Sequence, residues 1–485
     1  MHWIDIIIFV VYFIAMIGVG FYFFTKNKDT EDYYVGGRNM NSWHIGLSVV
    51  ATDVGGGFSI GLGGLGFLMG IAGSWMLFTG LIGAWLAAVF LIPKVSELAR
   101  TQKFLTFPQL LQFHYNGKVA LLAGIISAIG YIGFTSSQLL AGAKLASATF
   151  LELDLNMALL IMGVIAVGYT VIGGMKAVIY TDTVQWIILM GGLVFIGIPL
   201  SYTAIGGLDA IREAVPSELL SLGNIKPVTF FNWFITIVPI WFVGMTLYQR
   251  IYACKDEKTA KKAWYIAGLF EYPIMAFMGV LLGLFARVAA EQGMFEYAGF
   301  TTAGDIDAEM GLPMLLRTVL PVGLMGLMLS AYFSAIMSTA DSCLMAASGN
   351  VVTDILDRIV PRKLSDKENL RYSQIATLFI GVLALLLATM MQNVLELMLL
   401  SYAFMVSGLF VPVIGALFWK RSTPTAAFWA MLLGGLTTTL LVLTDTALPF
   451  GLDANIGGIG LSAAVFIILS LMFPKIIISE FETSR

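Results

Sequence analysis

The stretch Ser48-Val-Val-Ala-Thr-Asp-Val-Gly-Gly-Gly57 interrupts the second long apolar run of this chain. Each of its three consecutive glycines costs a helix about 1 kcal/mol relative to alanine, so we predict that the helix unwinds here. Unwound backbone is tolerated inside a bilayer only where it contacts protein or lines a cavity. Its free carbonyl groups can then ligate a cation. A seam of small residues for close helix packing is the alternative interpretation.

Asp53 is an ionisable residue within the same apolar segment. A charge at this depth is costly, so the residue is by default a candidate for a functional role. The alternative is that Asp53 caps the helix that follows the glycines, by accepting hydrogen bonds from its first N–H groups. The two interpretations are compatible.

Composition places the chain in a membrane. Of its 485 residues 58% are hydrophobic and 12% are charged, which does not suit a water-soluble globule built around one core. The net charge of −3 gives no indication of nucleic-acid binding, which requires a clustered basic face. The first apolar run, 3–25, is long enough to span a bilayer and lacks a basic lead-in, so we expect it to be retained and not cleaved as a signal.

Apolar runs of spanning length number about thirteen, which predicts one all-helical polytopic membrane domain over residues 1–485. The predicted spans are 3–25, 43–71, 74–98, 119–150, 156–175, 178–203, 230–253, 262–290, 312–348, 371–391, 394–418, 424–443 and 456–478.

Lysine and arginine collect in alternate loops, which sets the orientation. The basic loops are 26–38, 100–118, 255–262, 358–367 and 420–421, and the positive-inside rule places them in the cytoplasm. With an odd number of spans, the N-terminus is then outside and the C-terminus inside, as expected for a multi-pass protein of a bacterial inner membrane. We expect no enzyme activity and no organic cofactor, because no loop is long enough for a catalytic domain.

The ninth predicted span contains Ser334-Ala-Ile-Met-Ser-Thr-Ala-Asp-Ser342. On a helix the Ala335 carbonyl and the hydroxyls of Ser338 and Thr339 fall on one face, and three neutral oxygens suit a small hard cation. The alternative is that the hydroxyls only bond back to their own helix. The density of hydroxyls beside Asp341 favours a cation site. Asp182, which opens the sixth span, is equally well interpreted as a helix N-cap.

Five pieces of sequence, in this order, resemble the sodium/solute symporter family. They are Tyr33-Tyr-Val-Gly-Gly-Arg38, the Ala51-to-Gly57 stretch, Tyr169-Thr-Val-Ile-Gly-Gly174 with Thr181-Asp182 and Gln185, Gln249-Arg250, and Ser338-Thr-Ala-Asp-Ser342. The resemblance covers nearly the whole chain. It implies the five-plus-five inverted-repeat fold of the leucine transporter, with 43–203 as the first repeat, 230–418 as the second, and 3–25 and 424–478 as peripheral helices.

The resemblance also implies the coupling ion and its ligands. Carried over to this sequence, the sodium ligands are the carbonyls of Ala51, Val54 and Ala335 and the side chains of Ser338 and Thr339. Some members of the family have a second sodium site, which maps to Asp182, Ser338, Asp341 and Ser342. Asp341 stands where those members have serine, and a structural polar network is the alternative there.

Inverted repeats place the solute at their interface, near the middle of the membrane and against the broken helix. The residues that this places near the solute are Asp53, Gly55, Gly56, Gly57, Gln138, Trp241, Phe242 and Tyr402. Aromatic residues in membrane spans more often serve packing or anchor a helix at the interface, which is the alternative for the last three.

The implied function is sodium-coupled symport of a small organic solute by alternating access, with one or two sodium ions. Asp53 is typical of the proline branch of the family and the triple glycine of the choline branch, and Trp241 could hold a quaternary or secondary ammonium group by cation–π attraction. An amino acid, a quaternary amine, a monocarboxylate or a sugar all remain open. Proton-coupled or sodium-independent transport is the alternative. A channel or a membrane sensor is less favoured, because the polar residues are clustered and do not line a continuous pore.

Overall fold

The computed structural model describes residues 2–24, 34–53, 55–172, 175–359 and 365–473. Within these ranges every regular element is helical, and the only strand-like pairing is one isolated bridge between Met40 and Cys254. The all-helical prediction is therefore confirmed for the described part of the chain. Val54, which the sequence assigns as a sodium ligand, lies outside the described residues, as do Tyr33, Gly173 and Gly174 of the family motifs.

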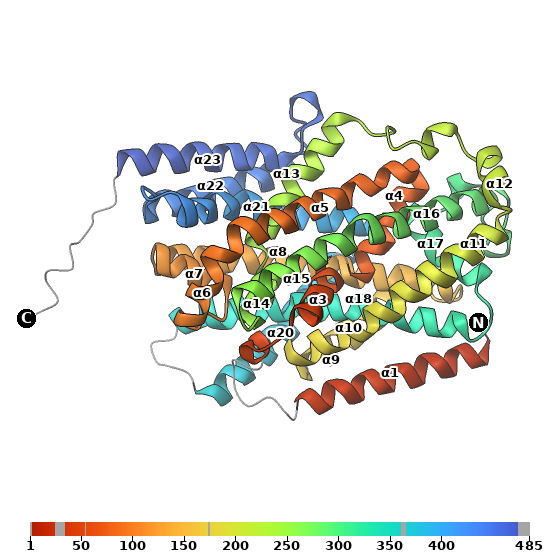
Figure 1. Cartoon of the computed structure of the whole chain (residues 1–485), viewed down its shortest axis with the longest axis horizontal. Helices are drawn as coiled ribbons and strands as arrows, with labels where there is room; N and C mark the ends of the chain where they lie inside the picture. Colours follow the sequence, from red (N-terminus) through yellow and green to blue (C-terminus); the bar gives the residue numbers. More distant parts are fainter. Residues whose placement is uncertain (1, 25–33, 54, 173–174, 360–364, 474–485) are drawn as a thin grey trace, which may run out of the picture.

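The first half of the bundle begins with the long apolar helix α1 (Figure 1). Its helices are α1 (Trp3–Phe24), α3 (Ser42–Asp53), α4 (Gly56–Met69), α5 (Trp75–Leu86), α6 (Ile92–Gln102), α7 (Phe107–His114), α8 (Gly117–Thr149), α9 (Leu155–Ile172), α10 (Met175–Gly192), α11 (Ile198–Ala204) and α12 (Gly207–Ala214).

The second half follows an outer connection and ends with two apolar helices. Its helices are α13 (Pro227–Val243), α14 (Met245–Ala253), α15 (Glu257–Leu269), α16 (Ala276–Glu291), α17 (Ala308–Val319), α18 (Leu324–Gly349), α19 (Asp357–Ile359), α20 (Asp366–Ala388), α21 (Val394–Phe418), α22 (Pro424–Leu443) and α23 (Ala454–Met472). A π-helical segment, η6 (Phe270–Met275), joins α15 to α16.

The lengths of these helices suit a multi-pass membrane protein. Among the described residues, nine helical stretches are long and apolar enough to cross a bilayer, and the bent pair α13 and α14 adds a tenth if it is one span. Two shorter apolar helices, Trp3–Tyr12 and Leu155–Gly168, fall within predicted spans. The count of thirteen spans stays a prediction.

The predicted break in the second span is confirmed. Helix α3 ends at Asp53 and α4 begins at Gly56, and between them Gly55 has a φ of 33°. A residue with a Cβ is strained at this φ. A Cβ on Gly55 would also lie 2.3 Å from the hydroxyl oxygen of Thr339. Only glycine therefore lets the break lie against α18.

Three other predicted spans are not continuous helices, and one of them, 262–290, has a non-helical residue, Tyr272, within η6. The span 230–253 is bent by 43° between α13 and α14, where Gly244 takes an extended conformation. The span 312–348 is divided into α17 and α18 by the segment 320–323, because Pro321 lacks an N–H group and Gly323 has a φ of 89°. Neither Gly244 nor the segment 320–323 has a run of glycines like Gly55–Gly57, which marks the break between α3 and α4.

The broken helix lies inside the bundle and the terminal helices lie at its edges. Helix α3 packs against α10, α15 and α18, and α4 packs against α16, α17 and α18. In Figure 1, α1 runs along the lower edge while α22 and α23 form the opposite edge. Every residue of α3 from Ile45 to Asp53 is buried. The unwound backbone is therefore surrounded by protein, as the membrane requires.

Candidate functional site

The hydroxyl of Thr339 joins the broken helix to α18. It donates hydrogen bonds to the Ala51 carbonyl at 2.9 Å and to the Ala335 carbonyl, one turn back on its own helix, at 3.1 Å. The side chain of Thr339 is fully buried. Three of the five oxygens predicted to bind sodium, those of Ala51, Ala335 and Thr339, are thus gathered at one point.

These oxygens have the chemistry of a sodium site. In transporters with interrupted helices, unwound carbonyl groups and the C-terminal ends of half-helices coordinate sodium. Ala51 is in the last turn of α3, where carbonyl groups lack a helical partner. The helix dipole also favours a cation at this end. The oxygens available here are neutral, which suits a monovalent ion.

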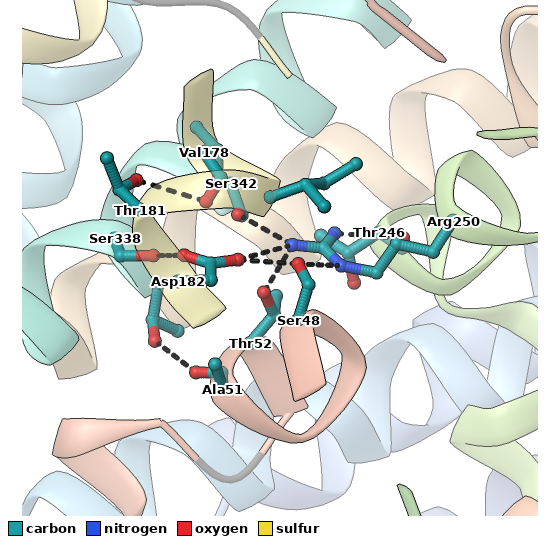
Figure 2. A network of polar contacts seen from close by, with 12 residues as sticks. Ser48, Ala51, Thr52, Val178, Thr181, Asp182, Thr246, Arg250, Ser338 and Ser342 are labelled. Carbon is teal, nitrogen blue, oxygen red and sulfur yellow. Dashed lines mark hydrogen bonds and ion pairs between the residues drawn. The ribbon is translucent and has the colours of Figure 1, made fainter. Parts of the chain in front are cut away.

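The fourth predicted sodium ligand with a described position, Ser338, faces a second polar cluster. Its hydroxyl donates to the Asp182 carboxylate of α10, and Ser48 of α3 donates to the same carboxylate at 2.5 Å. Figure 2 shows Asp182 between these two hydroxyls. When a serine hydroxyl donates its proton, its lone pairs stay available to a cation. Ser338 can therefore serve both clusters.

Arg250 of α14 completes this second cluster. One terminal nitrogen of its guanidinium group donates to Thr52, to Ser342 at 3.1 Å and to Asp182 at 3.4 Å. The ε nitrogen donates to Ser48 at 3.1 Å. Figure 2 shows the guanidinium group reaching this cluster from the side opposite Ser338. The side chains of Arg250 and Asp182 are fully buried, so each depends on the other for charge compensation.

The residues predicted for a second sodium site are only partly together. Asp182, Ser338 and Ser342 are in the cluster that Arg250 enters, whereas Asp341 accepts a hydrogen bond from Thr170 of α9 at 2.5 Å. Gln249-Arg250 is one of the motifs that resemble the family, but no role was predicted for Arg250 in this cluster. The signal was a basic residue at the end of an apolar span, where pairing with a buried acid is expected.

Several residues predicted to lie near the solute surround the break. The Tyr402 hydroxyl of α21 donates to Asp53 at 3.3 Å. Gln138 of α8 lies so close to Gly57 that a Cβ on the glycine would come within 2.3 Å of the amide oxygen. That amide oxygen has no hydrogen-bond partner among the described residues. Asp53, Gly57, Gln138 and Tyr402 are therefore brought together.

The two aromatic residues predicted for the solute face different neighbours. Trp241 is fully buried, contacts Trp264 with ring centroids 6.4 Å apart, and lies against Gly83 of α5. Phe242 packs edge-to-face against Phe410, with centroids 6.0 Å apart. The indole N–H of Trp241 meets no acceptor in the described part of the chain. Trp241 is the better candidate for contact with the solute, because Phe242 has an ordinary packing partner.

Two charged residues within predicted spans were missed by sequence reasoning. Lys144 of α8 is buried and pairs with Asp307 at 2.6 Å and with Glu309 at 2.7 Å. Glu271 of η6 is fully buried, and neither of its carboxylate oxygens meets a donor in the described residues. The signal was available, because a charge in the apolar runs 119–150 and 262–290 is as unusual as Asp53.

Cavities lie at both ends of the bundle, and contacts join distant segments of the chain at one of these ends. A cavity of about 790 Å³ opens beside α4, α17 and α21, and residues at its rim include Trp233, Asp307, Gln392 and Asp453. At the opposite end Arg38 donates to the Phe104 carbonyl at 2.7 Å.

Two further contacts lie at that opposite end. Tyr34 hydrogen bonds Ser373 at 2.6 Å, and the Met40 N–H donates to the Ala253 carbonyl at 3.0 Å. All three contacts join the segment before α3 to distant parts of the chain.

Comparison with known protein families identifies the family of this chain. A model of the sodium:solute symporter family matches residues 33–434. This chain belongs to the sodium:solute symporter family. The match contains both halves of the broken helix and the whole of α18, so the two clusters described above lie inside the family region. The match ends within α22 and leaves out α1 and α23.

Relatives and solved structures agree with this assignment. The chain is 28% identical to the osmoregulated proline transporter OpuE of Bacillus subtilis, over 96% of this chain and 94% of the relative. It is 28% identical to sodium/glucose cotransporter 1 of Oryctolagus cuniculus, over 92% of this chain and 73% of the relative. The fold resembles that of a substrate-bound, outward-open Na+-coupled sialic acid symporter, with a TM-score of 0.79, 20% identity, and coverage of 98% of this chain and 99% of that one. These relatives are transporters that carry different small organic solutes.

Proposed function

We propose that this protein imports a small organic solute into a bacterial cell by sodium-coupled symport across the inner membrane. The observation that carries the proposal is the junction at Thr339, where a buried hydroxyl gathers the Ala51 and Ala335 carbonyls at the end of a broken helix. Relatives named for sodium cotransport support sodium as the coupling ion. The family match supports symport over a channel or a sensor.

The sodium ligands are the oxygens of Ala51, Ala335, Ser338 and Thr339, together with the Val54 carbonyl. We infer one sodium ion per cycle, because Arg250 already supplies a positive charge to Asp182 and Ser342. A second ion among Asp182, Ser338, Asp341 and Ser342 would have to displace the guanidinium group or share its ligands. The Asp341 carboxylate is moreover engaged by Thr170.

Transport proceeds by alternating access, with the described conformation open to the outside. Three residues of the cavity lining, Asp307, Gln392 and Asp453, fall in loops between predicted spans that the positive-inside rule places outside. The contacts of Tyr34, Arg38 and Met40 lie on the opposite side, which we place in the cytoplasm. Sodium binding at the Thr339 junction links α3 to α18 and so favours the arrangement in which the solute site is formed. Release inside requires the cytoplasmic contacts to open.

The organisation behind this cycle is two inverted repeats, residues 43–203 and 230–418, flanked by 3–25 and 424–478. The two bent helices support it, because α3 with α4 opens the first repeat and α13 with α14 opens the second. Inverted repeats commonly place a broken helix at equivalent positions. With thirteen spans, the N-terminus lies outside and the C-terminus in the cytoplasm.

Uptake into proteoliposomes tests the proposal. The purified protein is reconstituted, and labelled proline, choline, acetate, glucose and myo-inositol are supplied with an inward sodium gradient, an inward potassium gradient or a proton gradient. We expect at least one solute to accumulate with sodium and none to accumulate with potassium or protons alone. Accumulation driven by the proton gradient in sodium-free buffer would contradict the proposal.

A further inference from the structure

A pair of acidic side chains lies at the break and takes no part in either cation cluster. Asp53 is the last residue of α3, and Glu271 is in η6, the interrupted segment between α15 and α16. The two carboxyl groups are near enough to interact electrostatically. Both side chains are at least nine-tenths buried. Two carboxylates carry no N–H or O–H group, so neither can satisfy the other while both are ionised.

No base of the described chain neutralises this pair by contact. The charge of Arg250 acts on Asp53. However, its N–H groups are engaged by Asp182, by three hydroxyls and by the Thr246 carbonyl. The Tyr402 hydroxyl reaches only Asp53. A buried carboxylate without donors costs several kcal/mol, so the pair must either take up a proton or meet a partner from outside the chain.

The unpartnered oxygens around the break are all acceptors. Both oxygens of Glu271 lack a donor, and so does the amide oxygen of Gln138. Glu271 interacts electrostatically with Asp53 at the end of α3, and Gln138 lies against Gly57 at the start of α4. A ligand that satisfies these oxygens must bring N–H or O–H donors, and beside two acids it should also be positively charged.

The position of the pair places it on the path of the solute. On α5, Met76 lines the outer cavity, Gly80 lies against the Glu271 carboxylate one turn further in, and Gly83 lies against Trp241. These three residues recur at helical spacing, so they share one face of α5. The acidic pair therefore lies about one helical turn further into the bundle than the cavity. The indole ring of Trp241 lies about one turn further in than the pair.

The cavity above the pair is acidic. Its described lining includes Asp307, Glu309, Glu396 and Asp453 but no lysine or arginine. Lys144 compensates part of this charge by pairing with Asp307 and Glu309. A cleft lined by one sign of charge concentrates ligands of the opposite sign. The cavity thus favours entry of cations over entry of anions such as a monocarboxylate.

We propose that Asp53 and Glu271 bind a primary or secondary ammonium group of the transported solute. The inference rests on the proposed function and narrows its solute class. An amino acid or an amine satisfies the acceptors, whereas a sugar or a monocarboxylate brings no positive charge. A quaternary amine brings charge without N–H donors. Trp241 provides an aromatic face at the inner side of the same site.

Matched probes test the proposal by their effect on thermal unfolding of the purified full-length protein in saturating sodium. One set has N–H donors on a positive nitrogen: alanine, proline and ethylammonium. The second set is fully N-methylated: trimethylalanine, dimethylproline and ethyltrimethylammonium. The third has no nitrogen: propionate, cyclopentanecarboxylate and glucose. We expect at least one probe of the first set to raise the unfolding midpoint and its partners in the other sets to have no effect.

Two variants locate the binding group. Glu271→Gln keeps the shape but adds a donor amide, and should weaken the apparent affinity for the active probe by about tenfold or more. Gly80→Ala places a Cβ 2.1 Å from a Glu271 carboxylate oxygen, which is the movable end of a side chain, so the protein should fold while the acid shifts and the affinity falls. Gly191→Ala, at a helical glycine with no neighbour within 4 Å, and Glu218→Gln on the surface are the controls.

The outcomes separate this inference from the proposed function. Equal binding of nitrogen-free or quaternary probes, binding by no ammonium probe, or unchanged affinity in both Glu271→Gln and Gly80→Ala would overturn the ammonium site. Unchanged affinity in both variants would mean that Asp53 and Glu271 only share a proton. Sodium is titrated separately without any probe. Failure of sodium alone to stabilise the wild-type protein would instead overturn the proposed sodium coupling.

Discussion

Two cation clusters lie side by side on α18, and adjacent residues of that helix belong to them. At the first, Thr339 gathers two backbone carbonyls and the described chain offers no positive side chain to them. At the second, Ser338 and Ser342 flank the Asp182 carboxylate and Arg250 supplies the positive charge. The first cluster has only neutral oxygens and can accept an ion from solution. The second has an acid and a base and is complete within the chain.

The difference indicates that the two clusters have different roles. Under the proposed function, the ion pair holds α3, α10, α14 and α18 together, because its cation is part of the chain. The neutral oxygens would bind and release sodium, because they remain hydrogen bonded without the ion, as Thr339 is to the Ala51 carbonyl. Ser338 lies between the Thr339 cluster and the Asp182 cluster, so a structural change in one cluster can alter the other. Substitutions at the two clusters test this difference between their roles.

The largest effect is expected from removing the built-in cation. Arg250→Gln leaves Asp182 as a fully buried acid without a positive partner, which typically costs about 3–5 kcal/mol of stability. Thermal unfolding of the detergent-solubilised protein should show a large fall in midpoint. The double variant Arg250→Gln with Asp182→Asn removes both charges and should recover most of that loss. Equal midpoints for the single and the double variant would mean that the pair is not the source of the effect.

A tenfold effect on sodium is expected from either hydroxyl at the junction. Ser338→Ala or Thr339→Ala removes one of roughly five oxygens around a desolvated ion, which should raise the half-saturating sodium concentration about tenfold, or about 1.4 kcal/mol. Sodium-activation curves of uptake measure it. Ser330→Ala is the matched control, because this buried hydroxyl on the same helix bonds back to the Gly326 carbonyl at 2.6 Å. If all three variants behave alike, the hydroxyls serve only packing.

A smaller effect is expected from Asp53→Asn, which keeps the size of the side chain and removes its charge. Asp53 follows Ala51 in the last turn of α3, but its described hydrogen bond is with Tyr402. We expect the apparent sodium affinity to weaken about threefold, or about 0.7 kcal/mol, with membrane insertion intact. Uptake measured over a range of sodium concentrations checks this. Unchanged sodium dependence would reduce Asp53 to a residue that ends a helix.

Much of the fold could be predicted because membrane spans are marked by long apolar runs. The break after Asp53 was predicted because consecutive glycines penalise a helix wherever they occur. The break at Gly244 was missed because a single glycine in an extended conformation leaves no such mark, and its φ of −66° is open to any residue. The division of α17 from α18 was missed although Pro321 and Gly323 were visible, because the flanking runs were continuous in hydrophobicity.

The site was only partly predictable for a different reason. The Thr339 junction followed from hydroxyls at helical spacing, which is local information. The position of Arg250 inside the Asp182 cluster depends on how α14 packs against α3 and α10, and no spacing along the chain encodes it. The contact between Asp53 and Glu271 joins residues more than two hundred positions apart. A buried charge marks such residues as candidates, but only the packing says which partners they meet.

The most direct measurement of the central claim is a sodium titration of thermal unfolding for the wild-type protein, Thr339→Ser and Thr339→Val. An ion that binds only the folded protein raises its stability by RT ln(1 + [L]/Kd), so the midpoint should climb with sodium and not with potassium. Thr339→Ser keeps the oxygen and should follow the wild type. Thr339→Val keeps the shape without the oxygen and should need about tenfold more sodium for the same rise. Coincident curves for the serine and valine variants, or for sodium and potassium, would contradict the account.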